Sequence, residues 1–102
     1  MIRHMVHLRF AADVTTADKA GLYAGLAALR GHLHGILDFQ HRPNISPETP
    51  VVHGFTEMFW FDFADPASRN AYLGDPDHQA MGARLVAAVG GIDGIMVCDF
   101  AP

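Results

Sequence analysis

The sequence predicts an α+β fold of the ferredoxin-like type, with the element order β-α-β-β-α-β and a four-stranded antiparallel sheet. Two segments, 2–10 and 54–63, alternate apolar and polar residues with the period of a strand. Two other segments repeat apolar residues at helical spacing, and glycines and prolines separate all of these segments. A chain of 102 residues is of single-domain length, so we expect one domain over 1–102.

In the first half of the chain, a strand is expected over 2–10, with the side chains from Ile2 to Phe10 at even positions on one face. Thr15 and Asp18 approximate a capping box and predict a helix over 16–33. Its buried face carries leucines at steps of four, three and four: Leu22, Leu26, Leu29 and Leu33. A second strand over 36–42 and a proline-rich loop over 43–53 follow.

The second half begins with a strand over 54–63, whose odd-numbered residues form an aromatic row. Asp65-Pro66 and Asp75-Pro76 each predict a helix start, because aspartate caps a helix and proline suits its first position. The first of these helices ends at Gly74, and the glycines after 89 end the second. The last strand is expected over 95–100.

Composition and charge exclude several classes of function. The formal net charge is −4 and the seven basic residues are scattered, which argues against a nucleic-acid partner or an anionic membrane surface. No apolar run approaches the length of a spanning helix, and the first residues do not resemble a signal peptide. Cys98 is the only cysteine, so we expect no disulfide and a cytoplasmic location. No nucleotide, zinc-protease or serine-hydrolase motif is present, so no cofactor and no metal are expected.

One face of the predicted sheet packs on the helices, and the other is also apolar. A patch of this size usually marks an interface, so we expect a homodimer with two sheets packed face to face. The residues expected in the interface are Met5, Met58, Trp60, Met96 and Phe100. The alternative is a monomer in which the loop over 43–53 covers this face.

The candidate chemical residues gather at one end of the helix-facing side. His78 lies in the first turn of the last helix, where the helix dipole favours a neutral imidazole suited to act as a base. Asp99 and His4 meet there because the last strand runs beside the first. Asp99 would hold His78, His4 or both, and a purely structural ion pair is the alternative. The Tyr72 hydroxyl could hold a carbonyl oxygen or an enolate, or could be an ordinary core tyrosine.

The ligand pocket is expected between helices and sheet. Its lining would comprise the side chains of Leu22, Tyr23, Leu26, Glu57, Phe59, Phe61, Ile95 and Val97. Glu57 interrupts the aromatic row, so it is either a second polar group deeper in the pocket or the partner of a basic side chain.

Four segments resemble the stress-responsive A/B barrel (Dabb) family: 1–6, 54–56, 71–80 and 97–100. The resemblance implies a ferredoxin-like protomer that dimerises into an α+β barrel. A plant polyketide cyclase of this family closes its substrate by an intramolecular aldol reaction without a cofactor. Its working residues match Tyr72, His78, Asp99 and His4 of this sequence. This chain has Glu57 where the cyclase has a histidine, and Asp75 where many family members have a histidine.

We therefore expect a homodimer that binds a small, apolar, oxygenated molecule. One alternative is a cofactor-free enzyme, a cyclase or isomerase, that uses histidine acid/base chemistry on a carbonyl or polyketide-like substrate. Others are a ligand-free structural or stress-protective dimer and, by fold analogy alone, a cofactor-independent monooxygenase.

Overall fold

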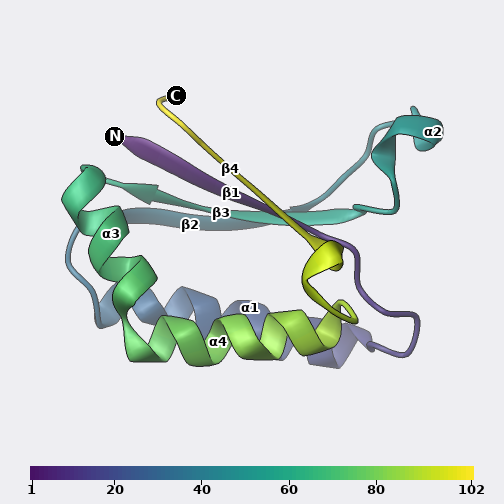
Figure 1. Ribbon diagram of the computed structural model, residues 1–102, viewed down its shortest axis with the longest axis horizontal. Helices are drawn as coiled ribbons and strands as arrows, with labels where there is room; N and C mark the ends of the chain where they lie inside the picture. The colour runs from purple at the N-terminus through teal and green to yellow at the C-terminus, as the bar shows by residue number, and fades with distance from the viewer.

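A four-stranded antiparallel sheet covered by two long helices on one face forms the protein (Figure 1), which confirms the predicted ferredoxin-like fold. The computed structural model describes residues 1–102. The strands are β1 (Ile2–Leu8), β2 (Ile36–Pro43), β3 (Glu57–Phe63) and β4 (Ile95–Phe100). Their spatial order is β2-β3-β1-β4, so the first strand lies between the third and the last.

The helices begin where side chains cap their free backbone N–H groups. Before α1 (Thr16–Ala28), Thr15 and Asp18 form a complete capping box, with both hydrogen bonds at 3.0 Å. Asp65 caps α3 (Pro66–Gly74) by accepting a hydrogen bond from the Ser68 N–H. Asp75 separates α3 from α4 (Pro76–Ala88), because its own backbone is extended and its carboxylate caps the second helix.

The first predicted helix ends earlier than expected. Its regular part stops at Ala28, a 3-10 turn follows over Leu29–Gly31, and Gly35 then adopts a left-handed φ of 82°. This glycine approaches α3 so closely that a Cβ atom would lie 2.0 Å from the Ser68 Oγ. The chain therefore leaves the helix through a turn that only glycine fits well.

The segment expected as the start of the third strand is instead a turn. His53 and Gly54 have left-handed φ angles of 55° and 76°, and the Thr56 N–H bonds to the Gly54 carbonyl. The chain turns at these residues, so β3 begins at Glu57 and not at Gly54. The preceding loop contains the short helix α2 (Thr49–Val52), which the sequence pattern did not predict.

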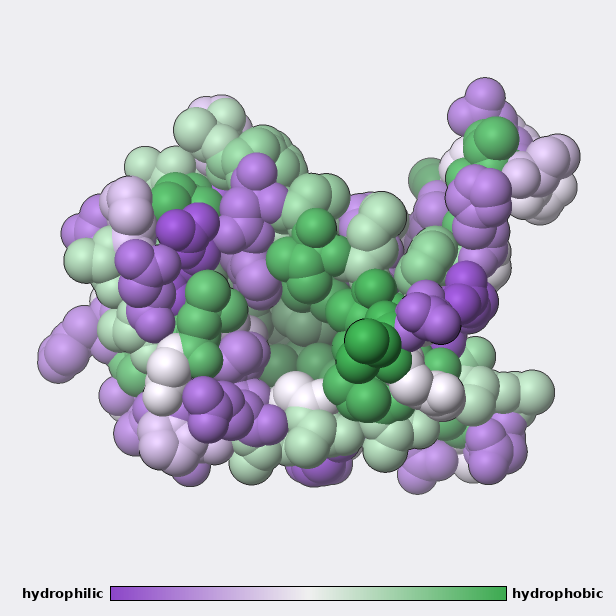
Figure 2. Space-filling model, viewed as in Figure 1, coloured by the Kyte–Doolittle hydropathy of each residue, from purple (hydrophilic) through white to green (hydrophobic).

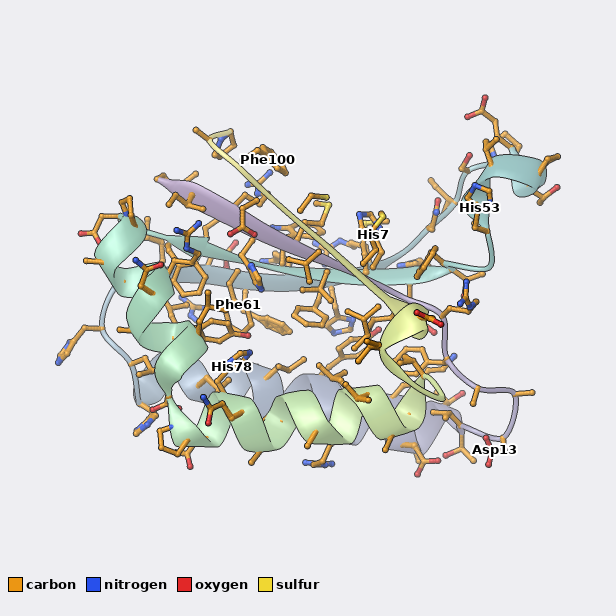
Figure 3. All side chains as sticks on the ribbon, viewed as in Figure 1. His7, Asp13, His53, Phe61, His78 and Phe100 are labelled. Atoms are coloured by element: carbon orange, nitrogen blue, oxygen red, sulfur yellow. The ribbon has the colours of Figure 1, made fainter.

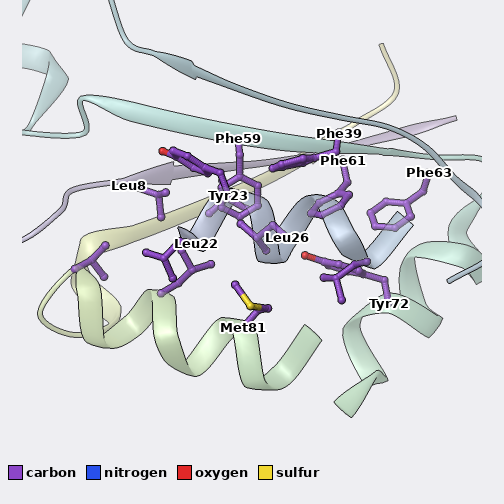
Figure 4. Close-up of a cluster of buried hydrophobic side chains, with 14 residues drawn as sticks. Leu8, Leu22, Tyr23, Leu26, Phe39, Phe59, Phe61, Phe63, Tyr72 and Met81 are labelled. Atoms are coloured by element: carbon purple, nitrogen blue, oxygen red, sulfur yellow. The ribbon is translucent and has the colours of Figure 1, made fainter. Parts of the chain in front are cut away.

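The hydrophobic core lies in the layer between the sheet and the helices (Figure 4). Phe59, Phe61 and Phe63 from β3 meet Leu26 of α1 and Tyr72 of α3 there, each at most 2% exposed. Aromatic rings from every second position of β3 pack at centroid distances of about 6 Å, which suits edge and offset contacts. The aromatic row in the sequence is therefore the centre of the core.

The opposite face of the sheet carries no helix. Trp60 lies there with the guanidinium groups of Arg3 and Arg42 at 5.6 and 5.8 Å from its ring. Met96 and Phe100 remain 47% and 44% exposed, because the loop that carries α2 projects from one end of the sheet and leaves this face open (Figure 1). None of the helices has the length and apolar character needed to cross a membrane.

Candidate ligand cavity and its polar end

A cavity of about 470 Å³ lies between the sheet and α4, on the side of the edge strand β4. Figure 2 shows the hollow, with apolar residues on its floor and rim. Its lining residues are His4, Val6, Phe59, Tyr72, Leu73, His78, Gly82, Leu85, Val86, Ile95, Val97 and Asp99. Gly82 helps to keep this space open, since α4 presents no side chain at that position and no atom lies within 4 Å of a Cβ built there.

The structure brings all four candidate chemical residues to this cavity, together with Phe59, Ile95 and Val97 of the expected lining. Three other expected lining residues, Leu22, Leu26 and Phe61, belong to the closed core and do not line the cavity. The reason is the position of α1, which packs over the β2 side of the sheet and fills the space there. The open space therefore lies beside β4.

Tyr23 and Glu57 also lie away from the cavity, in a separate depression between α1 and β2. The Tyr23 hydroxyl donates to Glu57 at 3.1 Å, and the Lys19 ammonium lies 2.6 Å from the other carboxylate oxygen. Burial, followed by the nearby Glu57 charge, raises the pKa of Tyr23. Glu57 is therefore the partner of a basic side chain, Lys19, and not a second polar group deeper in the pocket.

Asp99 contacts His4 and not His78. The two residues are direct partners across β1 and β4, and the His4 Nδ1 lies 2.7 Å from the Asp99 Oδ1. His4 is only 5% exposed, so its polar ring needs this partner. The second carboxylate oxygen accepts a hydrogen bond from the Arg69 Nη1 at 3.0 Å. Arg69 was not among the candidates, although it lies three residues before Tyr72 and thus on the same face of α3.

His78 lies at the start of α4, on the side that faces the sheet and Phe61 (Figure 3). Its ring centroid is 3.9 Å from that of Tyr72, and its Nδ1 is buried with no hydrogen-bond partner. Burial, followed by the charge of His4, lowers the pKa of His78, while the backbone of Leu73 and then the Asp75 carboxylate act in the opposite sense. The imidazole is therefore neutral at pH 7 and has an unused ring nitrogen.

Tyr72 is 1% exposed, and burial raises the pKa of its phenol. Its hydroxyl therefore stays protonated at neutral pH, and it makes no hydrogen bond within the chain. The ring also meets the edge of His4 at a centroid distance of 5.7 Å. The polar end of the cavity thus combines a phenol donor with two imidazoles.

A second polar cluster lies just outside the cavity, where His32 contacts Asp75 and Asp77 at 2.9 and 3.3 Å. These are residue types that bind metals, and their ligand atoms lie within 4.8 Å of one another. The Asp75 carboxylate, however, also accepts the backbone N–H groups of Asp77 and His78. The cluster is therefore the N-terminal cap of α4, and its ion pair with His32 connects the region after α1 to the start of α4.

The fold and the cavity define a ferredoxin-like α+β domain with a ligand-sized apolar pocket and a titratable end. The sequence model of the stress responsive A/B barrel domain matches residues 2–102, so the chain belongs to the Dabb family. No match is found among curated proteins.

Solved structures agree with this assignment. A dimeric ferredoxin-like protein of unknown function from Jannaschia sp. CCS1 is 31% identical, with a TM-score of 0.87 over 99% of this chain and 98% of that one. A Dabb family protein from Mesorhizobium loti is 24% identical, with a TM-score of 0.78 over 99% and 95%. Hydroxynitrile lyase from Passiflora edulis is 16% identical, with a TM-score of 0.82 over 97% and 90%. The last two similarities establish the shared fold only.

Proposed function

We propose that this protein binds a small, apolar, oxygenated molecule in the cavity beside β4. The observation that carries the proposal is the cavity itself, about 470 Å³ in volume, lined mainly by hydrophobic side chains with polar groups at one end. Natural ligand sites have this size and this distribution of polarity. A ligand-free structural protein has no need for such a space, because unfilled apolar volume lowers stability.

The polar end supports an oxygen-containing ligand. The Tyr72 phenol offers a donor that no group in the chain uses, and burial keeps it protonated. His78 offers a buried ring nitrogen that lacks a partner. A ligand with a carbonyl or hydroxyl group would supply the missing hydrogen bonds, and its apolar part would contact Val86, Ile95 and Val97.

A second candidate function is acid/base catalysis on a carbonyl compound, and the His4–Asp99 contact favours it. A carboxylate that accepts the Nδ1 proton leaves Nε2 of a neutral imidazole as the base. In this scheme Nε2 removes a proton from the carbon next to the carbonyl. The bonding electrons pass to the carbonyl oxygen, where the Tyr72 hydroxyl stabilises the enolate. The enolate carbon then attacks a second carbonyl or is reprotonated, which gives cyclisation or isomerisation.

We also propose that two copies pack through the open sheet faces. The supporting observations are the exposed Met96 and Phe100 and the dimeric state of the Jannaschia relative. The charged residues on this face are compatible with burial, because Arg3 and Asp62 satisfy each other through two hydrogen bonds of 2.9 and 3.1 Å. The loop with α2 projects from the end of the same face and exposes Ile45 at 89%, so it would extend the contact.

Native mass spectrometry of the protein purified from its own host tests the ligand. The wild-type protein should retain a small molecule, and Gly82→Leu should lose it, because a leucine at this position fills the cavity. Gly21→Leu is the matched control, since Gly21 also has open space around it but lies on α1 away from the cavity. Equal retention by both variants would contradict the assigned cavity.

A further inference from the structure

We propose that Arg69 is a positioning residue of this site, which holds Asp99 and through it fixes the tautomer of His4. The inference rests on the proposed function, because it assigns a role within the same cavity. Three elements contribute one residue each: His4 from β1, Asp99 from β4 and Arg69 from α3. Asp99 lies between the other two, with one oxygen 2.7 Å from His4 and the other 3.0 Å from Arg69.

Asp99 needs a second partner because of where it lies. β4 is an edge strand, and the Asp99 side chain is 25% exposed. A carboxylate in this position with only one partner would be free to rotate toward water. The Arg69 guanidinium holds the outer oxygen, and Arg69 is itself oriented by a hydrogen bond of 3.1 Å from its Nε to Asn70. The carboxylate is thereby kept in the plane that His4 requires.

The fixed carboxylate determines which His4 nitrogen can react. An ionised carboxylate only accepts hydrogen bonds, so the proton of the neutral ring must be on Nδ1. The Nε2 lone pair then remains available, and this nitrogen makes no hydrogen bond within the chain. Without Arg69 the Asp99 contact weakens, and the tautomer with the proton on Nε2 becomes populated.

The same ion pair bears on the charge of the ligand. The cavity lining contains no lysine or arginine, and Arg69, which contacts the lining residue Asp99, is already neutralised by it. His78 is kept neutral by burial, and Asp75 is held by His32 and by the helix it caps. A carboxylate ligand would therefore find no free cation there, so the site is suited to a neutral carbonyl or alcohol.

Nitrogen-15 NMR of the His4 ring tests the tautomer directly at pH 8, where an ordinary imidazole is neutral. The wild-type spectrum should show the Nδ1–H form, and Arg69→Gln should show a growing share of the other tautomer. Arg69→Lys keeps a cation beside Asp99 and should restore most of the wild-type pattern. Arg84→Gln, which alters an arginine on α4 outside the cavity lining, should change nothing.

An unchanged His4 tautomer in Arg69→Gln would overturn the proposal. Arg69→Met keeps the aliphatic stem and replaces the glutamine variant if that variant does not fold.

Titration with acetophenone and benzoate, which have nearly the same shape, tests the ligand class. The neutral ketone should bind about tenfold more tightly or better, since an ionised carboxylate loses its hydration without gaining a partner. Equal affinities contradict the neutral-site inference. If neither compound shifts an NMR resonance of a cavity residue, the result contradicts the proposed ligand binding. The result for the His4 tautomer is independent of that outcome.

Discussion

His4 and Asp99 lie directly opposite each other on adjacent strands and share a hydrogen bond of 2.7 Å, although 95 positions separate them in the chain. This contact makes His4 the oriented imidazole of the cavity. His78 is the second imidazole, with a buried nitrogen that has no partner. The two histidines therefore have different roles, one held by a carboxylate and one kept neutral by its surroundings.

The first prediction concerns the titration of His78. Its pKa is lowered by burial and by His4, and the Leu73 backbone and the Asp75 carboxylate partly oppose this. Asp75→Asn should therefore lower the pKa of His78 further, and asparagine should still cap the helix. Asp99→Asn should have a smaller effect, because Asp99 contacts His4 and Arg69. An NMR titration compares the two variants, and a larger shift in Asp99→Asn would contradict the arrangement.

The second prediction is a loss of stability in acid. Burial lowers the pKa of His78 and of His7 in the folded protein, so the unfolded chain binds protons more readily. The free energy of unfolding should consequently fall as the pH drops below about 6.5, the ordinary value for histidine, and continue to fall toward the lower folded pKa. His78→Gln removes the part of this pH dependence that is due to His78. Denaturant melts between pH 7 and pH 5 should show a shallower decline for this variant, and parallel curves would disprove the assignment.

The third prediction concerns the proposed dimer. Trp60→Glu places a charge in the centre of the open sheet face, where the partner would bury it. We expect monomer or aggregate by light scattering. Ala83→Glu introduces the same charge at an exposed position of α4 and should leave the assembly unchanged. A soluble, fully dimeric Trp60→Glu protein would rule out face-to-face packing.

The fourth prediction concerns local stability. β3 pairs with β2 on one side and with β1 on the other, so its amides should be among the slowest to exchange. The loop over 44–56 makes few such bonds and should exchange first. Hydrogen exchange resolved by residue provides the test, and faster exchange in β3 than in the loop would be incompatible with the described topology.

The fifth prediction concerns the turn before β2. Gly35→Ala combines a left-handed backbone with a collision against Ser68 and should destabilise the protein by about 1–3 kcal/mol. Gly31→Ala is the control, because nothing lies within 4 Å of a Cβ at that position. Thermal unfolding measures both variants. Similar midpoints would show that the turn tolerates a side chain.

Strand parity was sufficient to predict several site residues from the sequence. His4, Asp99 and Val97 lie on the cavity side because every second residue of a strand faces the same way and the strand order follows from the fold. Parity could not separate Phe59, which lines the cavity, from Phe61, which does not, since both face the helices. That distinction depends on which half of the sheet α1 covers.

The sequence also could not determine which of the two histidines contacts Asp99. Topology placed His4 and His78 near the same carboxylate, but side-chain direction decides between them. Arg69 was missed because its contact depends on the rotation of α3 about its own axis. Its position three residues before Tyr72 was the available signal.

The position of β1 in the sheet has a consequence for how the protein folds. β1 is made first, yet its neighbours are β3 and β4, and β4 is the last element of the fold. Such pairings have a high contact order, which slows folding, so β1 must wait with an open edge until the end of the domain is synthesised. His4 acquires its carboxylate only in that final step. Loss of a few residues from β4 would therefore expose the edge of a central strand to intermolecular pairing and remove the cavity wall in the same event.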